Sequence, residues 1–273
     1  MKLRVLSGLP GSGKTTYARE QVREHGSIGR INRDDLRAML FDSVWSGPRE
    51  GVVIDCEKAI AKVLLNHKLV ALVDDTNLSA KTLSLWSGVA KSLDAQLEIK
   101  TLDTSLAECI KRDAARPKPV GEAVINRVAL FAGMIDFGPK PIVLVDVDGT
   151  TANGDHRQHF IEGPRKDWKS YFSLCHMDEP VRKIIDEVNS YRDHTIIVCS
   201  GRPDTYQHET LKWLREKAEL KFDYIFMRAG NDKREDSIIK LEILDHLPAD
   251  QIEIVYDDRL GRPNPCGTLT EFG

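Results

Sequence analysis

The stretch that most constrains the fold is SGLPGSGKTT, residues 7–16, which joins an apolar run to a polar helical pattern. Four residues separate Gly8 from Gly13, and Lys14 and Thr15 follow directly. In this pattern, backbone N–H groups surround phosphate oxygens, the lysine reaches the outer phosphates and the hydroxyl binds Mg²⁺. A plain glycine turn would not require Lys and Thr at these two positions. The sequence therefore predicts a phosphate-binding loop between a strand and a helix.

The loop also predicts which residues hold the phosphates. Helix N-termini carry unpaired N–H groups and a positive dipole end, so the first helical turn adds to anion binding. The predicted phosphate-binding residues are Gly8, Gly11, Ser12, Gly13, Lys14, Thr15 and Thr16.

Apolar β-type runs alternate with helical patterns along the first half of the chain. Strands are predicted at 3–7, 27–31, 69–74 and 96–102, with helices at 52–68, 80–94 and 121–135. This alternation is typical of βαβ units around a parallel sheet. Gly138, Pro139 and Pro141 then break the pattern. We therefore predict two domains, at 1–138 and 139–273.

A second alternation follows the break. Strands are predicted at 141–149, 194–201, 224–227 and 252–258, with helices at 179–191, 204–219 and 235–247. The expected fold class is α/β, with two doubly wound parallel-sheet domains.

Composition narrows the protein class. The 273 residues are 41% hydrophobic and 30% charged, with a net charge of −3, and no apolar run approaches the roughly 18 residues of a membrane span. The N-terminus enters the first predicted strand without a leader pattern. We therefore expect no membrane association and a cytoplasmic location. A reducing compartment also fits the scattered, odd set of cysteines: Cys56, Cys109, Cys175, Cys199 and Cys266.

Ligands of open α/β sheets bind beyond the carboxyl ends of the strands, so the residues that follow each strand are candidates. Asp34, in the stretch NRDDLR, either caps a helix or accepts a proton from an attacking hydroxyl. Arg37 lies three residues later on the same helical face and could bind a substrate phosphate.

The stretch DDTN ends the third predicted strand. Asp74 and Asp75 could orient the Mg²⁺ shell or position the acceptor, or they could simply begin a turn. We favour Asp75 over Asp74, and we count Asp75, Thr76 and Asn77 among the substrate-binding candidates.

Arg112 and Arg116 lie four residues apart at the end of a predicted helix, before a proline stop. Cations at a helix C-terminus are favoured by the dipole in any case. As a lid over the nucleotide, the pair would neutralise charge on the transferred phosphoryl group.

A different chemistry is indicated by DVDGT, residues 146–150, which ends an apolar strand with two carboxylates. Such a pair suits phosphate-ester cleavage, in which one aspartate attacks phosphorus and the other protonates the leaving alcohol and then activates water. Mg²⁺ is needed to offset the repulsion between these acids and a phosphate.

Other strand ends and a helix in this half carry matching groups. Ser200 could donate to phosphate, Lys240 could neutralise a phosphorylated aspartate, and Asp236 could orient Lys240. Asp257 or Asp258 could complete the metal shell.

Seven motifs together carry a family resemblance: GLPGSGKTT, INRDDLR, DDTN, KRDAAR, DVDGT, SGR and DDR. Over nearly its whole length, the chain resembles the bifunctional phage-type polynucleotide kinase/3′-phosphatases. The resemblance implies a P-loop 5′-hydroxyl kinase followed by a haloacid-dehalogenase-like (Rossmannoid) phosphatase. It further implies ATP and Mg²⁺ as cofactors, DNA or RNA ends as substrates, a nucleic-acid ligase as functional partner and a homotetramer, located in the host cytoplasm if a phage encodes it.

The same resemblance implies a role for each matching residue. Lys14 and Thr15 would bind ATP phosphates and Mg²⁺, Asp34 would be the general base, and Arg37 would contact the acceptor strand. Asp75 would support that site, and Arg112 with Arg116 would form the lid. In the second half, Asp146 would be the nucleophile and Asp148 the acid/base. The remaining residues of that site, which include further metal ligands beside Asp146 and Asp148, would be Arg202, Asp236, Lys240, Asp257 and Asp258.

Two features depart from the family pattern. The substrate-contacting arginine after DVDGT has two candidates, Arg157 and Arg165, of which we favour Arg157. The chain also ends in DDRLGRPNPCGTLTEFG, where the family usually continues with a tryptophan-containing helix and another strand.

Two other function classes stay open at this point. A small-molecule or nucleoside kinase fused to a metabolite phosphatase would use the same phosphate chemistry on a different alcohol. A nucleotide-sensing module would have a second half without catalysis, which the intact acid pair Asp146 and Asp148 disfavours. Arg37 and a basic groove would distinguish a polymer end from a free metabolite, because only a polymer brings a neighbouring phosphodiester.

Overall fold

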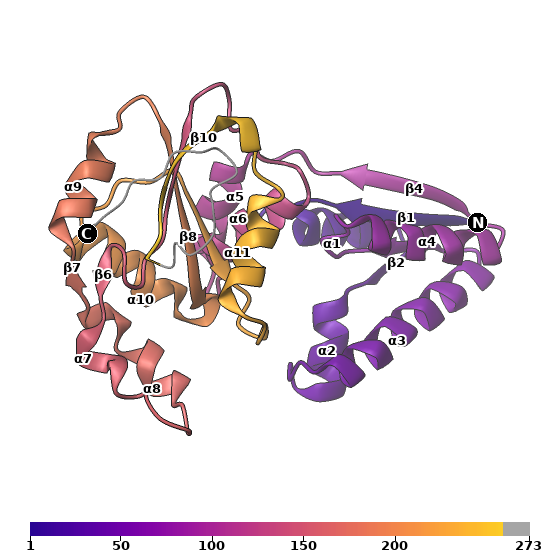
Figure 1. The fold of residues 1–273 in the computed structure, drawn as a ribbon. Helices are drawn as coiled ribbons and strands as arrows, with labels where there is room; N and C mark the ends of the chain where they lie inside the picture. Colours follow the sequence, from indigo (N-terminus) through magenta and orange to yellow (C-terminus); the bar gives the residue numbers. More distant parts are fainter. Residues whose placement is uncertain (259–273) are drawn as a thin grey trace. The chain divides into compact units, whose positions relative to one another are not determined.

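The computed structural model describes residues 1–258, and the chain divides into two compact units, Met1–Pro119 and Val120–Gly273. Each unit has its own sheet and its own core (Figure 1). The terminal stretch discussed above, with Cys266, lies outside the described residues from 259 onward.

The first unit is built on a four-stranded parallel sheet in the order β2-β3-β1-β4. Its strands are β1 (Lys2–Ser7), β2 (Ile28–Ile31), β3 (Val70–Val73) and β4 (Gln96–Thr101). Because successive side chains of a strand point to opposite faces, Leu3 and Val5 join one core cluster and Leu6 joins another. Both faces of this sheet are therefore covered.

The first unit has five helices. They are α1 (Lys14–Glu24), α2 (Arg33–Phe41), α3 (Gly47–Asn66), α4 (Ala80–Ser92) and α5 (Leu106–Ala114). Of these, α1, α3 and α4 pack on the sheet. Side chains cap three of them: the N–H groups of Asp35, Thr82 and Glu108 donate to Asn32, Ser79 and Ser105. Helices α3 and α4 supply Leu65 and Trp86 to one face of the sheet, and α1 supplies Ala18 to the other.

The second unit contains a parallel sheet in the order β10-β5-β8-β9 and a short antiparallel pair. The strands are β5 (Ile142–Val145), β8 (Thr195–Pro203), β9 (Tyr224–Arg228) and β10 (Ile252–Tyr256), with β6 (Ala152–Asn153) and β7 (Glu179–Pro180) forming the pair. Val143 and Val145 face one core cluster, whereas Ile142 and Leu144 face the other. Burial on both faces explains the unbroken apolar run of β5.

The helices of the second unit cover its sheet and extend one end of it. They are α6 (Glu122–Phe131), α7 (Asp155–Gln158), α8 (Trp168–Ser173), α9 (Arg182–Ser190), α10 (Gln207–Lys212) and α11 (Asp236–Leu244). Short 3₁₀ turns occur at η1 (Cys175–Met177), η2 (Asp204–Tyr206) and η4 (Ala249–Gln251), and a π turn at η3 (Trp213–Lys217). Helices α7 and α8 lie together at one end of the unit (Figure 1).

The structure confirms the predicted fold class of two α/β units with parallel sheets. The units divide earlier than the boundary expected at 138/139, because α6 packs in the second unit. There the Asn126 amide and the Arg127 guanidinium donate to the carbonyl oxygens of Ile225 and Met227 in β9, at 3.4 and 2.8 Å. Gly138 and Pro139 therefore lie inside the second unit.

Candidate active sites

The phosphate-binding loop lies between β1 and α1, as predicted. Gly11 and Gly13 have φ values of 87° and 97°, in the left-handed region that favours glycine. A Cβ on Gly11 would lie 2.3 Å from the Cys109 carbonyl oxygen of α5. The loop can therefore close against α5 only with glycine at this position.

Lys14 lies inside this loop. Its ammonium donates to the carbonyl oxygens of Gly8 and Leu9 at 2.8 and 2.7 Å and contacts the buried Ser12 hydroxyl at 3.3 Å. Burial lowers the pKa of Lys14 to about 8, against the opposing effect of Asp74. Thr16 is exposed on the first turn of α1. The ammonium of Lys14 is thus held inside the loop by two backbone carbonyl oxygens and the Ser12 hydroxyl.

The sequence predicts a hydroxyl and a carboxylate as cation ligands beside this loop. In the structure, Thr15 and Asp74 form such a pair. The Thr15 hydroxyl donates to Asp74 at 3.4 Å, and the Arg30 guanidinium donates to Asp74 at 2.7 Å. Asp75 turns the other way and accepts from the backbone N–H of Arg33 at 3.0 Å. The geometry therefore favours Asp74 over Asp75 as a Mg²⁺-orienting group, the reverse of the order expected from the sequence.

Asp34 and Arg37 lie together on α2. Asn32 caps this helix, so Asp34 is not the capping residue. The side chain of Asp34 is 83% exposed. The Arg37 guanidinium contacts Asp34 and donates to both carboxylate oxygens of Glu50 at 3.0 Å. The side chain of Asp34 is thus available to a substrate hydroxyl, while Glu50 holds its neighbour Arg37.

Two other members of the DDTN stretch serve the loop itself. The Asn77 side chain is buried and donates to the Leu6 carbonyl oxygen at 2.8 Å. The carbonyl oxygen of Thr76 accepts from the Gly8 N–H at 3.0 Å. These contacts join the end of β1 to the segment after β3, and the burial of Asn77 argues against its predicted contact with substrate.

The two arginines that the sequence predicts as a lid lie in the last turn of α5 and just after the helix. Arg112 pairs with Glu108 at 2.8 Å and Arg116 with Asp113 at 3.2 Å, and both side chains are about half exposed. Cys109 of the same helix contacts the loop at Gly11. Arg112 therefore lies in α5, and Arg116 follows two residues after the end of this helix, which packs against the loop.

The second site lies at the carboxyl ends of β5 and β10. The carboxylates of Asp146, Asp257 and Asp258 offer oxygens that lie within 4.8 Å of one another. Gly149 has a φ of 84°, and a Cβ there would lie 2.2 Å from a carboxylate oxygen of Asp258. Glycine therefore permits the approach that closes this carboxylate cluster. Three carboxylates at this spacing fit a hard cation such as Mg²⁺.

Lys240 of α11 supplies the positive charge that this cluster requires. Its ammonium lies 3.0 Å from Asp146, 2.9 Å from Asp257 and 3.4 Å from Asp236. Burial raises the pKa of Asp146 to about 7, the Lys240 ammonium opposes that rise, and the carboxylates of Asp257 and Asp148 add to it. The predicted pairing of Asp236 with Lys240 is present.

Asp148 is oriented by arginines and is not part of the carboxylate cluster. The Arg202 guanidinium donates to it at 2.7 Å, and Arg157 also contacts it. Although burial opposes the charged form, Arg202 and Arg157 hold the pKa of Asp148 at about 2. The carboxylate of Asp148 is thus engaged by two guanidinium groups and lies outside the cluster of Asp146, Asp257 and Asp258, and its role as a metal ligand stays a prediction.

Arg157 and Arg202 are fully buried, so neither presents its guanidinium to solvent as a substrate-binding residue would. Both donate to Asp178, at 2.6 Å each. Arg165, the alternative to Arg157, is exposed. Ser200 is buried as well, and its hydroxyl accepts from the Arg202 N–H at 3.2 Å. The arginines predicted to hold substrate thus hold Asp148 in place instead.

Sequence reasoning missed two buried acids. Asp178, in the stretch MDEP, follows no periodic pattern that would identify it. Glu57 offered a signal: it occupies the buried face of α3 together with Val53, Ala61 and Leu65, at four-residue spacing. It pairs with Arg33 at 2.7 Å, and burial together with Asp75 raises its pKa to about 8.

A cavity of about 960 Å³ lies at the second site. Asp146 and Asp148 line it together with the aromatic residues Trp168, Tyr171, Phe172 and Tyr206. The β9–α11 segment, with Lys233 and Arg234, lines it too. Asp146 and Asp148 are therefore open to a ligand of substantial size.

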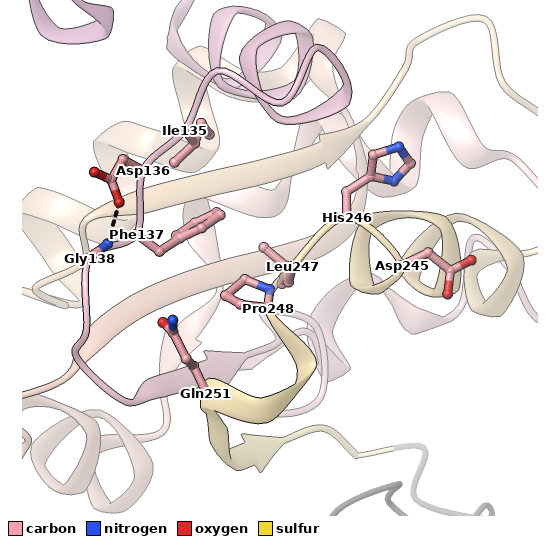
Figure 2. A pocket seen from close by; sticks show the side chains of 9 residues that line it. All are labelled: Ile135, Asp136, Phe137, Gly138, Asp245, His246, Leu247, Pro248 and Gln251. Atoms are coloured by element: carbon pink, nitrogen blue, oxygen red, sulfur yellow. Dashed lines mark hydrogen bonds between the residues drawn. The ribbon is translucent and has the colours of Figure 1, made fainter.

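A second hollow, of about 420 Å³, lies between the segment after α6 and the turn from α11 to β10 (Figure 2). Ile135, Phe137 and Pro248 line it, and Gly138 donates to the Asp136 carboxylate at its edge. It contains none of the residues that the sequence predicts for either site.

Among residues 1–258, no helix combines the length and the apolar character that a bilayer crossing requires. Of the five cysteines, the four in this part of the chain are unpaired.

Comparison with known proteins finds a match for each unit. Residues 3–130 match the family model described as AAA domain, and residues 140–261 match that described as polynucleotide kinase PNKP phosphatase domain. A protein of Autographa californica nuclear polyhedrosis virus, which bears the name of a bifunctional polynucleotide kinase/RNA ligase, is 25% identical over 97% of this chain. The chain spans 40% of the length of that relative.

Solved structures were compared as well. One described as the Pnkp1/Rnl/Hen1 RNA repair complex is 26% identical, with a TM-score of 0.42, over 95% of this chain and 90% of that chain. The APS kinase CysC of Mycobacterium tuberculosis is 23% identical, with a TM-score of 0.36, over 50% of this chain and 76% of that chain.

Proposed function

We propose that this protein heals broken nucleic-acid ends, because its first unit matches the AAA domain model and its second matches the model of the polynucleotide kinase PNKP phosphatase domain. The first unit would transfer the γ-phosphoryl group of ATP to a 5′-hydroxyl. The second would hydrolyse a 3′-phosphate. The observation that carries this proposal is the coexistence of a glycine cradle around Lys14 and a carboxylate cluster around Asp146 in one chain.

In the first unit, Asp34 would take the proton of the 5′-hydroxyl as its oxygen attacks the γ-phosphorus of ATP. Lys14 and the loop N–H groups would hold the outer phosphates, while Arg112 and Arg116 would stabilise the charge that develops on the moving group. Arg37, held by Glu50, would bind a phosphate of the acceptor strand.

In the second unit, a carboxylate oxygen of Asp146 would attack the 3′-phosphorus, and the bond from phosphorus to O3′ would break. In the ionised form that Arg202 and Arg157 stabilise, Asp148 would take a proton from the water that releases inorganic phosphate. Proton donation from Asp148 to O3′ in the first step would require its protonated form. Lys240, at 3.0 Å, would stabilise the phosphorylated Asp146.

Each site has oxygen ligands that would hold Mg²⁺. In the first unit they are Thr15 and Asp74, and in the second they are Asp146, Asp257 and Asp258. When bound, the ion would neutralise charge on the phosphate oxygens. The donor sets fit this assignment because all of them are hydroxyl or carboxylate oxygens.

The products would be a 5′-phosphate and a 3′-hydroxyl, the ends that a ligase joins, so a nucleic-acid ligase is the expected functional partner. The tetrameric state and the host cytoplasm, expected from the family resemblance, stay proposals. Sedimentation of the purified protein measures the first of them.

The test is a labelled-phosphate assay on purified protein. With γ-labelled ATP, 5′-hydroxyl oligonucleotides should be labelled far better than free nucleosides, and 3′-phosphorylated oligonucleotides should release phosphate. A preference for nucleosides would instead support a small-molecule kinase and contradict end healing.

A further inference from the structure

We propose that Trp168, Phe172 and Tyr206, here called the aromatic wall, bind the nucleobase of the 3′-terminal nucleotide while its phosphate reaches Asp146. The inference rests on the proposed 3′-phosphatase function and adds a base-stacking subsite to it. All three residues line the cavity that contains the carboxylates of Asp146 and Asp148.

The rings of the wall are arranged as a row. The Trp168 and Phe172 centroids lie 5.8 Å apart at an interplanar angle of 20°, and the Phe172 and Tyr206 centroids lie 5.7 Å apart at 35°. Trp168 is 47% exposed, and none of the three belongs to the core clusters of the described residues. A row of near-parallel rings beside a cavity offers the surface on which a base stacks.

The wall is held in a fixed relation to the catalytic acid. Asp167 caps α8, and the Tyr206 hydroxyl donates to the Lys169 carbonyl oxygen at 3.4 Å. Behind the wall, the Tyr171 ring lies 4.0 Å from the Arg157 guanidinium. Arg157 in turn contacts Asp148, so the stacking surface and the acid/base share one packed support.

The lining of the cavity carries both signs of charge: the cations are Lys169, Arg228, Lys233 and Arg234, and the acids are Asp146, Asp148, Asp232, Glu235 and Asp236. Lys169 and Lys233 line it, and neither ammonium has an ion-pair partner among residues 1–258. The nearby Arg228 and Arg234 are paired with Asp236 and Asp232, which line the cavity too. The two unpaired ammonium groups are therefore available to the phosphodiester that precedes the terminal nucleotide.

The volume of the cavity, about 960 Å³, lies at the upper end of the range for small-ligand pockets and accommodates a nucleotide. Every base presents a π face, so the wall would accept any terminal base. A base inserted here must leave its stack, so the ligand is a single-stranded or frayed 3′ end.

The test compares two oligonucleotides with 3′-phosphates that differ only in the terminal nucleotide, which carries a base or is abasic. For the wild type, kcat/KM should be about tenfold or more higher with the base present, the size expected for one stacked base. Trp168→Ala and Phe172→Leu should bring this ratio toward one, whereas Trp168→Phe should keep it. Trp45→Ala, an exposed tryptophan in the other unit, is the control and should leave the ratio unchanged.

Thermal unfolding of each variant shows that it is folded, and a ratio taken between two substrates cancels any loss of active protein. A wild-type ratio near one would overturn the stacking subsite while 3′-phosphatase activity stands. A ratio that survives in both Trp168→Ala and Phe172→Leu would overturn it as well. If the wild type released phosphate from neither oligonucleotide, the proposed function itself would fail, and the subsite with it.

Discussion

The two sites hold their charged groups in opposite ways. In the first unit, the predicted phosphate-binding loop contributes backbone N–H groups and the buried Lys14, whereas Asp34 and Arg116 are exposed. In the second unit, Arg157, Arg202 and Asp178 are fully buried and hold Asp148 in place. The difference shows that one site is shaped by a loop and the other by a network of buried charges.

This contrast has a consequence for stability. Exposed ion pairs contribute little to folding, because water solvates both partners well. Removing one member of a buried pair leaves an uncompensated charge in the interior, which costs far more. Substitutions in the first site should therefore affect mainly activity, whereas those in the buried network should affect folding as well.

The largest expected effect is on the nucleophile. Asp146→Asn keeps the shape of the side chain but removes the attacking charge, so 3′-phosphatase activity should fall at least about 10³-fold. Phosphate release from a 3′-phosphorylated oligonucleotide measures this. Transfer from ATP to 5′-hydroxyl ends, assayed on the same preparation, should be unchanged, and its loss would contradict the separation of the sites.

Asp178→Ala tests the buried network. It leaves Arg157 and Arg202 with Asp148 as their remaining carboxylate in the network, so the free energy of unfolding of the second unit should fall by about 3–5 kcal/mol. Denaturant unfolding measures this. Asp34→Ala is the matched control, since that side chain is 83% exposed and its loss should change stability by less than about 0.5 kcal/mol. Equal losses from both substitutions would erase the contrast between the sites.

Lys14→Ala tests the loop. The ammonium is the cation inside the phosphate cradle, so 5′-phosphorylation should fall about 10²–10³-fold. Labelled-phosphate transfer to an oligonucleotide measures the loss. Release of 3′-phosphate should continue at the wild-type rate, and a parallel fall in that rate would show that the two activities share one site.

Asn32→Ala should have the smallest effect. It removes the cap of α2, which carries Asp34, and should lower the stability of the first unit by about 1 kcal/mol. Ser79→Ala removes the cap of α4 at a similar cost. We expect 5′-phosphorylation to fall several-fold in Asn32→Ala and to persist in Ser79→Ala. Equal activity in the two variants would show that the position of α2 does not limit the reaction.

The fold was largely predictable because the apolar runs that mark strands and the periodic patterns that mark helices were both strong. Apolar runs of four to six residues, separated by helical patterns, place every strand of the two main sheets. The boundary was less predictable. Gly138 and Pro139 end a pattern in the sequence, but only packing shows that α6 belongs with β9.

Residue types at strand ends predicted most of the residues of the candidate sites, but they did not predict which side chains contact one another. Lys240 could be placed beside Asp236 from helical spacing alone. That Asp74 rather than Asp75 faces Thr15 depends on how the strand end turns. That Arg157 is buried depends on Asp178, which is distant in sequence and follows no periodicity. Contacts of this kind are set by tertiary packing.

The most direct test of two independent sites uses one oligonucleotide with a 5′-hydroxyl and a 3′-phosphate, incubated with ATP and Mg²⁺. Mass spectrometry identifies both ends of the product. Lys14→Ala should convert only the 3′ end and Asp146→Asn only the 5′ end, and a mixture of the two variants should convert both. If either variant alone leaves both ends unchanged, or the mixture leaves one end unconverted, the chain does not contain two separate phosphate-handling sites.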